Sequence, residues 1–184
     1  DTTRARLTIG SSTFYVDTAD FAWFNGDTIN YVPPTPFNDG DSVQIRVLEI
    51  YDTQGNRGYP YPWYFLVDKS PPQVISLFPD SDSFVRDSTP TIEIVLADSG
   101  SGIEIDSLEV TVQGWTFSRT SLDISWGIGR RNAEITIDTE ELLLTNFEDG
   151  ETVNVCLTKA MDRVSQDYCG PNEMELYCYF FVID

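Results

Sequence analysis

The sequence contains one phrase twice, and this internal repeat constrains the fold more than any single residue does. Residues 37–52 (FNDGDSVQIRVLEIYD) return without a gap as residues 147–162 (FEDGETVNVCLTKAMD). The flanking segments repeat in the same order: residues 7–14 correspond to 110–117, and residues 64–68 correspond to 180–184. Repetition of this kind indicates a tandem array of one structural unit.

Short strands separated by turn-forming residues dominate the predicted secondary structure. Alternating apolar segments rich in β-branched and aromatic residues predict strands. Turn formers such as Asp98-Ser-Gly-Ser-Gly102 lie between them, and only residues 139–144 fit a helical turn. About seven strands in the second unit predict an immunoglobulin-type sandwich in an all-β chain. The expected strands cover residues 74–77, 91–97, 108–112, 116–124 with interruptions, 133–137, 153–161 and 177–183.

The repeat predicts two domains, divided near the stiff Pro71-Pro72 joint. Only six residues precede Leu7, whereas residues 69–109 precede the equivalent Val110. We therefore expect tandem immunoglobulin-like β-sandwiches, with an incomplete domain at residues 1–68 that lacks its first two strands and a complete domain at 69–184.

A sandwich without two strands exposes an apolar seam and an unpaired edge. One explanation is that the sequence is a fragment that starts inside a domain of a longer protein. The other is that a neighbouring subunit donates the missing strand, as in donor-strand complementation. The sequence leaves both open.

Charge narrows the range of partners. The chain has 30 acidic and 11 basic residues and a net charge of -19, which disfavours nucleic acid and anionic membrane surfaces. Its hydrophobic content of 41% is too high for a disordered acidic tail. No apolar run approaches the roughly 20 residues that span a bilayer, so we expect no membrane insertion.

The segments at residues 37–56, 63–72 and 98–103 carry a family resemblance. They resemble bacterial immunoglobulin-like (Big-type) tandem repeat domains of cell-surface and secreted proteins. The resemblance implies an extracellular location and a role in a stalk, an adhesin or a surface layer, with neighbouring repeats or copies as partners. The second unit departs from the pattern where a longer, cysteine-bearing loop, 162–172, replaces the short turn Asp52-Thr-Gln-Gly-Asn56.

The residues that carry chemistry argue against an enzyme. The chain has no histidine, which removes the commonest general base and the usual means of activating a serine or cysteine nucleophile. No pair of carboxylates stands out as flanking a cleft. We expect a protein without catalytic activity.

Acidic residues predict a calcium site at one end of the second sandwich. Asp68 lies in the incoming linker, Asp98 after the second strand and Asp162 after the sixth, and these three places meet at one end of such a fold. Calcium prefers several hard oxygen ligands. Asp is also a common turn residue that accepts backbone hydrogen bonds, which explains Asp162 and its repeat partner Asp52 without a metal.

Cysteine and aromatic residues supply two further expectations. Cys156 and Cys178 are expected on the outer face of adjacent strands, Cys169 competes for either partner, and we favour a disulfide that includes Cys178. Trp63 and Phe65 are expected to fill the core. Tyr59, Tyr61 and Trp115 are expected either to pack in the core or at its rim, or to present flat rings to a surface glycan.

We therefore expect a non-catalytic structural or adhesive segment of an extracellular repeat array. The alternatives are a filament or sheet subunit that assembles by strand donation between chains, and a carbohydrate-binding module.

Overall fold

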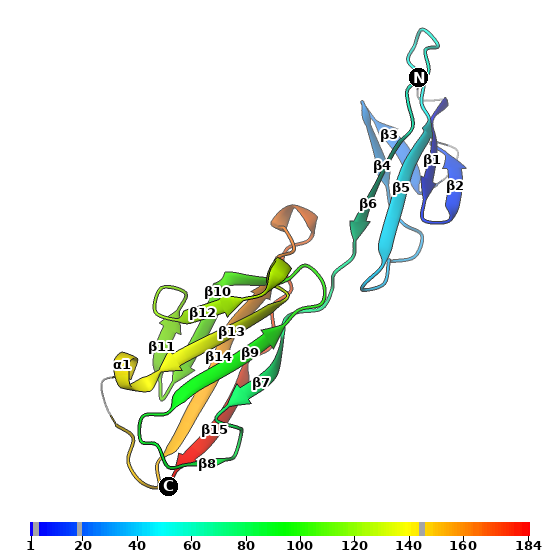
Figure 1. Ribbon diagram of the computed structural model, residues 1–184. Coiled ribbons are helices and arrows are strands. Elements are labelled where there is room, and N and C mark those ends of the chain that lie inside the picture. Colours follow the sequence, from blue (N-terminus) through cyan, green and yellow to red (C-terminus); the bar gives the residue numbers. More distant parts are fainter. Residues whose placement is uncertain (2–3, 18–19, 144–145) are drawn as a thin grey trace. The chain divides into compact units, whose positions relative to one another are not determined.

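The computed structural model describes residues 1, 4–17, 20–143 and 146–184. The chain forms two compact units, Asp1–Asp68 and Lys69–Asp184 (Figure 1). No helix among the described residues is long and apolar enough to cross a membrane. The only α-helix in the described ranges is α1 (Thr139–Leu143), and Leu144 of the expected helical turn lies outside them.

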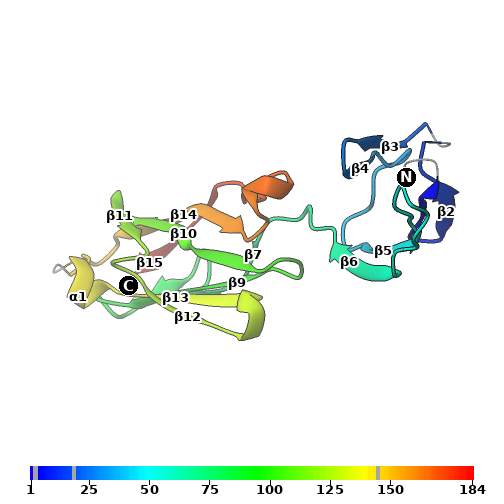
Figure 2. The ribbon, with the colours of Figure 1, turned by 90° about the horizontal axis from the view of Figure 1, so that it is seen from above.

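The second unit is a sandwich of two sheets, and Figure 2 shows β10 and β14 in one layer and β12 and β13 in the other. One sheet has the order β11 (Trp115–Ser118), β10 (Ile103–Val112), β14 (Thr152–Asp162), β15 (Tyr177–Ile183) and β8 (Phe84–Val85). The other has the order β12 (Asp123–Trp126), β13 (Asn132–Asp138), β9 (Thr91–Ala97) and β7 (Gln73–Phe78).

Alternation in the sequence explains how this sandwich is held together. Along β9, Ile92, Ile94 and Leu96 are buried while the residues between them are half-buried. The same alternation buries Val153, Val155 and Leu157 on β14 in the facing sheet, and one apolar core joins the two layers. Burial of alternate side chains fixes the register, because a slip by one residue would turn this whole set toward solvent.

The first unit repeats part of this topology with six strands. Its sheet has the order β2 (Ser12–Tyr15), β1 (Arg6–Ile9), β5 (Ser42–Glu49) and β6 (Tyr61–Leu66), which matches β11, β10, β14 and β15. The hairpin of β3 (Ala22–Asn25) and β4 (Thr28–Tyr31) matches β12 and β13 and lies on the other side of the unit (Figure 2).

The described part of the first unit contains no counterpart of β7, β8 or β9. Both units are immunoglobulin-like β-sandwiches, and the prediction that the first lacks its first two strands, β7 and β9, is confirmed. The short strand β8 was not predicted, because its two residues follow a run of Asp and Ser that is typical of a turn.

The missing strands leave apolar side chains of β6 uncovered. Trp63 and Phe65 are 41% and 40% exposed, whereas their repeat equivalents Tyr179 and Phe181 on β15 are 5% and 0% exposed. The prediction that Trp63 and Phe65 fill the core was therefore wrong. The residues have the right pattern for burial, but residues 1, 4–17 and 20–68 contain no equivalent of the strands that cover Tyr179 and Phe181.

Candidate functional site

An aspartate and an asparagine close the loop after the penultimate strand in both units. In the first unit the Asp52 carboxylate accepts hydrogen bonds from the backbone N–H of Gln54 at 2.9 Å and of Asn56 at 2.8 Å. The Asn56 side-chain amide donates to the other carboxylate oxygen at 2.7 Å, and the Asp52 N–H donates to the Asn56 carbonyl at 3.0 Å. We call this arrangement the Asp–Asn clamp.

The second unit keeps the clamp although its loop is longer. The Asp162 carboxylate accepts from the backbone N–H of Val164 at 3.1 Å and of Asn172 at 2.9 Å, and the Asn172 side chain donates to its other oxygen. The Asp162 N–H donates to the Asn172 carbonyl at 3.0 Å, as Asp52 does to Asn56. The prediction did not include Asn56 or Asn172, although Asn56 ends the short turn that begins at Asp52.

The clamp affects the ionisation of Asp52. The side-chain hydrogen bond from Asn56, followed by its backbone N–H, lowers the pKa of Asp52 below its ordinary value of 3.8. These donors bind the charged form of the carboxylate better than the neutral form, so the acid is held ionised.

Asp98 is positioned by a glycine-bearing turn. Its Oδ1 accepts hydrogen bonds from the N–H of Gly100 at 2.8 Å and of Gly102 at 3.0 Å. Gly102 has a φ of +89°, and a Cβ at this position would lie 2.4 Å from the Gly129 carbonyl oxygen. Only glycine fits here, so Gly102 fixes both the turn and the place of the Asp98 side chain.

The structure brings Asp68, Asp98 and Asp162 together. Asp68 is half-buried, while Asp98 and Asp162 are buried at 4% and 1% exposure. One carboxylate oxygen from each residue lies within 4.8 Å of the others. Oxygens bound to one calcium ion at about 2.3 to 2.6 Å are separated by at most about 5 Å. The three side chains therefore fit part of a calcium coordination sphere.

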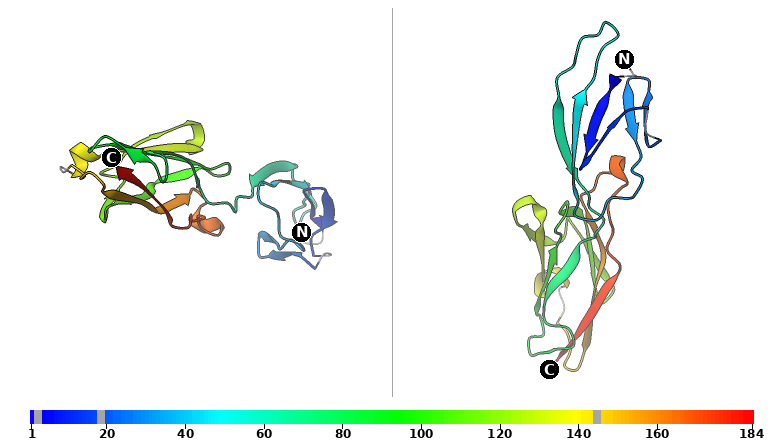
Figure 3. Two further views of the ribbon diagram at one scale, coloured as in Figure 1. Left: turned by 90° about the horizontal axis from the view of Figure 1, so that it is seen from below. Right: turned by 90° about the vertical axis from the view of Figure 1, so that its right-hand side faces the viewer.

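The cysteine prediction is confirmed for one pair. Cys156 and Cys178 lie directly opposite each other on β14 and β15, which run side by side (Figure 3), and form a disulfide with a Cα–Cα distance of 4.1 Å. Cys169 is a free, exposed thiol in the loop that the second Asp–Asn clamp closes. The bridge links the two strands on the outer face of the sheet, as the alternation of apolar residues predicted.

The aromatic glycan candidates are exposed in both units. Tyr59 and Tyr61 in the first unit are 94% and 69% exposed, and Trp115 in the second unit is 66% exposed. The ring of Tyr61 lies beside that of Trp63, with a centroid distance of 6.0 Å and a tilt of 36°. Two neighbouring rings of the first unit are therefore exposed together, but they are tilted against each other.

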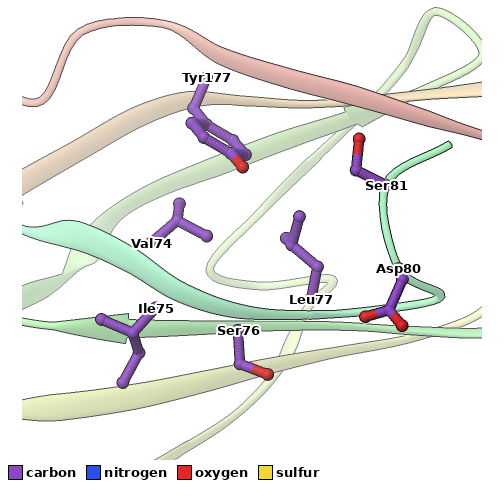
Figure 4. A pocket seen from close by; sticks show the side chains of 7 residues that line it. All are labelled: Val74, Ile75, Ser76, Leu77, Asp80, Ser81 and Tyr177. Atoms are coloured by element: carbon purple, nitrogen blue, oxygen red, sulfur yellow. The ribbon is translucent and has the colours of Figure 1, made fainter.

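A shallow pocket lies between β7 and Tyr177 of β15 in the second unit (Figure 4). Its apolar wall includes Val74 and Leu77, and its only carboxylate is Asp80. Its titratable groups are the carboxyl of Asp80 and the phenol of Tyr177.

No protein-family model matches the sequence, and no curated protein matches it significantly. Among solved structures, CopC from Methylosinus trichosporium OB3b is 15% identical with a TM-score of 0.39, over 61% of this chain and 93% of that one. The titin fragment A168–A169 is 13% identical with a TM-score of 0.34, over 98% of this chain and 83% of that one. Likeness at this level carries no argument about function.

Proposed function

We propose that this chain is a non-catalytic structural segment of an extracellular bacterial immunoglobulin-like repeat array that forms a stalk, an adhesin or a surface layer. The repeated topology of two units joined end to end in sequence supports a role as a spacer. The cross-strand disulfide supports an oxidising compartment, since such bonds persist mainly outside the reducing cytosol.

The observation that carries the proposal is the pairing of β8 with β15. These strands are parallel, with Phe84 opposite Val182 and Val85 opposite Ile183. Three backbone hydrogen bonds join this edge: Asp82 N–H to Phe180, Val182 N–H to Ser83 and Asp184 N–H to Val85. Tension applied to the two ends of the unit pulls β15 toward its C-terminus and β8 toward its N-terminus. Parallel strands pulled in this way are loaded in shear, so their bonds break together.

Calcium would add a second source of stiffness in the proposed array. Three carboxylates within 4.8 Å repel one another, and a divalent cation removes that repulsion. Because Asp68 is in the linker while Asp98 and Asp162 follow strands of the second unit, a shared ion would restrain the chain where it enters that unit.

Single-molecule pulling on the full chain tests the mechanical proposal. We expect the second unit to unfold in one cooperative step, while the disulfide keeps the segment between the bridged cysteines closed. Reduction should lengthen that step by about 80 Å, from 22 residues at about 3.6 Å each. Gradual extension at low force, without a discrete step, would contradict a load-bearing role.

Thermal unfolding with and without calcium tests the metal proposal separately. We expect calcium to raise the melting temperature of the second unit, and Asp98→Asn to remove the increase. Asp52→Asn is the matched control, because Asp52 accepts the same kind of backbone hydrogen bonds outside the three-acid cluster. An increase that Asp98→Asn retains, or none at all, overturns the site.

A glycan-contacting role is the second candidate, and it is favoured by the neighbouring rings of Tyr61 and Trp63 and by the exposed ring of Tyr59. Apolar faces of sugars stack on such rings. Titration with soluble cell-wall oligosaccharides should change tryptophan fluorescence, and Tyr61→Ala should abolish the change. No response at millimolar sugar would exclude this role.

A further inference from the structure

We propose that the end of β12 in the second unit is a binding site for a carboxylated sugar of an acidic polysaccharide. The site is built around Trp126, whose ring lies close to the guanidinium groups of Arg119 and Arg130. This inference goes beyond the proposed structural role, and its site lies in the other unit from the rings of Tyr61 and Trp63. It depends only on contacts within the second unit.

The segment that carries the site has the opposite charge to the chain as a whole. Residues 119–131 contain three arginines and one aspartate, whereas the chain has 11 basic and 30 acidic residues. Charges on an exposed surface are largely screened beyond about 8 Å at physiological salt. A ligand in contact with this segment therefore experiences the local charge rather than the net charge of the chain.

Trp126 provides an accessible aromatic surface beside two cations. Its ring centroid lies 5.8 Å from the Cζ of Arg119 and 5.9 Å from the Cζ of Arg130. Both distances are within the range of cation–π pairs. The Trp126 side chain nevertheless stays 48% exposed. The apolar face of a sugar can stack on the open part of this ring, with two guanidinium groups beside it.

The carboxylates that now face the two arginines hold them loosely. The Nε of Arg119 lies 3.7 Å from an oxygen of Asp106, which is longer than a hydrogen bond, and the Asp106 side chain is 80% exposed. The Nη1 of Arg130 lies 3.4 Å from an oxygen of Glu104. Both acids are on β10, in the facing layer of the sandwich (Figure 2).

A sugar carboxylate can replace such a partner with little loss. Exposed ion pairs contribute little to stability, and a pair longer than a hydrogen bond contributes least. A carboxylate that accepts two parallel hydrogen bonds from one guanidinium is a stronger partner. Arg119 is therefore the cation that we expect to bind the sugar carboxylate in place of Asp106.

The turn between β12 and β13 holds Arg130 in a fixed place. The Gly127 N–H donates to the Asn132 carbonyl at 3.1 Å, and the Arg130 N–H donates to the Gly127 carbonyl at 3.1 Å. Arg130 has a φ of +56°, a left-handed conformation that residues other than glycine rarely adopt. The close approach of Gly102 to the Gly129 carbonyl packs the turn against its neighbour. The cation beside Trp126 is thus in place before a ligand arrives.

These features favour an acidic sugar over an acidic peptide. A uronic acid carries an apolar face and a carboxylate on one rigid ring, which matches a tryptophan beside a guanidinium group. The carboxylate of an aspartate or glutamate in a peptide stands on a flexible side chain, whose ordering opposes binding. A neutral sugar could stack on Trp126 but would give neither arginine a new partner.

Trigalacturonic acid is the probe, titrated into the full chain and followed by the indole N–H signals in two-dimensional NMR. The chain has four tryptophans, so the Trp126 signal can be assigned by substitution. We expect a saturable shift of this signal. The neutral trisaccharide of galactose, which has the same rings without the carboxylates, should bind at least about tenfold more weakly.

Two variants keep Trp126 as the reporter. Arg119→Gln should weaken binding of trigalacturonic acid by about tenfold, which corresponds to about 1.4 kcal/mol, and should leave the neutral sugar unaffected. Trp115→Ala is the matched control, because it removes a ring of the same unit that is 66% exposed. This variant should bind the acidic sugar as the parent chain does.

Four results would overturn the inference. They are no shift at millimolar trigalacturonic acid, equal binding of the neutral sugar, undiminished binding by a folded Arg119→Gln chain, and equally tight binding of a triglutamate peptide. Failure here is distinct from failure of the proposed function, because pulling and calcium stabilisation do not depend on Trp126 or Arg119. A chain that resists tension but ignores the sugar remains a spacer without this site.

Discussion

Truncation of one repeated phenylalanine in each unit should have unequal effects. Phe65 and Phe181 occupy equivalent places on β6 and β15, but Phe65 is 40% exposed and Phe181 is fully buried. We expect Phe181→Ala to destabilise the second unit much more than Phe65→Ala destabilises the first. The two variants control for each other, because each removes a phenylalanine at the same position of an equivalent strand.

The expected magnitudes follow from burial. A fully buried Phe→Ala change costs about 3 to 5 kcal/mol, because apolar contacts are lost and a cavity remains. Phe65 keeps an edge-to-face contact with Phe37 at 5.8 Å, and aromatic contacts of this kind contribute about 0.5 to 1.5 kcal/mol. Its open side leaves no enclosed cavity, so we expect a loss of about 1 to 2 kcal/mol.

Urea unfolding followed by two-dimensional NMR measures the two losses separately, because resolved amide signals report each unit's own transition. Unchanged m-values would show that only stability changed. The reasoning would be refuted by equal losses in the two units, since these would mean that Phe65 is covered as well as Phe181.

Three further predictions concern single positions. Gly102→Ala should lower the free energy of unfolding of the second unit, measured with denaturant, by at least about 2 kcal/mol more than Gly114→Ala does. Both glycines have a positive φ, +89° and +85°, but of the two only Gly102 has a backbone oxygen within 3 Å of the added Cβ. Equal costs would contradict this. Asn56→Ala should raise the pKa of Asp52 in an NMR titration. Because folding lowers that pKa, the clamp stabilises the folded first unit at pH values above the unfolded pKa of 3.8, and this stabilisation is lost as the pH falls below it. An unchanged pKa of Asp52 in the variant would refute the role of Asn56. Burial raises the pKa of Tyr179, and its hydroxyl has no hydrogen-bond partner among the described residues. Tyr179→Phe should therefore leave the melting temperature of the second unit unchanged or raise it. A clear fall in the melting temperature would show that the hydroxyl has a partner.

Much of the fold was predictable because the internal repeat indicates the two units and the alternation of apolar and polar residues indicates the strands within them. Alternating apolar residues predicted β9, β13 and β15. Comparison of the residues before Leu7 with those before Val110 predicted that the first unit lacks its first two strands. The strand β8 could not be predicted from its two residues, because its pairing with β15 depends on tertiary contacts. The same limit explains Trp63, whose pattern is that of a core residue while its exposure depends on strands elsewhere.

Candidate side chains were predicted less completely than the strands. The positions of Asp98 and Asp162 followed from loop order in a sandwich. Strand parity placed Cys156 and Cys178 on the outer face of adjacent strands but left the partner of Cys178 open, and the structure pairs it with Cys156. The second clamp was missed, because Asn172 stands ten residues after Asp162 whereas Asn56 stands four after Asp52. The two units make the same Asp–Asn contact, but the different spacing of the two residues in the sequence does not reveal it.

Because the Asp–Asn clamp closes the loop at its base, the length of the loop can change without changing the pairing of the strands that the loop joins. The same contacts close residues 53–55 in one unit and 163–171 in the other. Tripling a flexible loop costs only about 1 kcal/mol of closure entropy, so inserted sequence at this point is inexpensive. The position therefore suits diversification, whether by natural sequence variation or by grafting a foreign peptide. The exposed thiol of Cys169 in the longer loop also offers a chemical handle for attaching a label there.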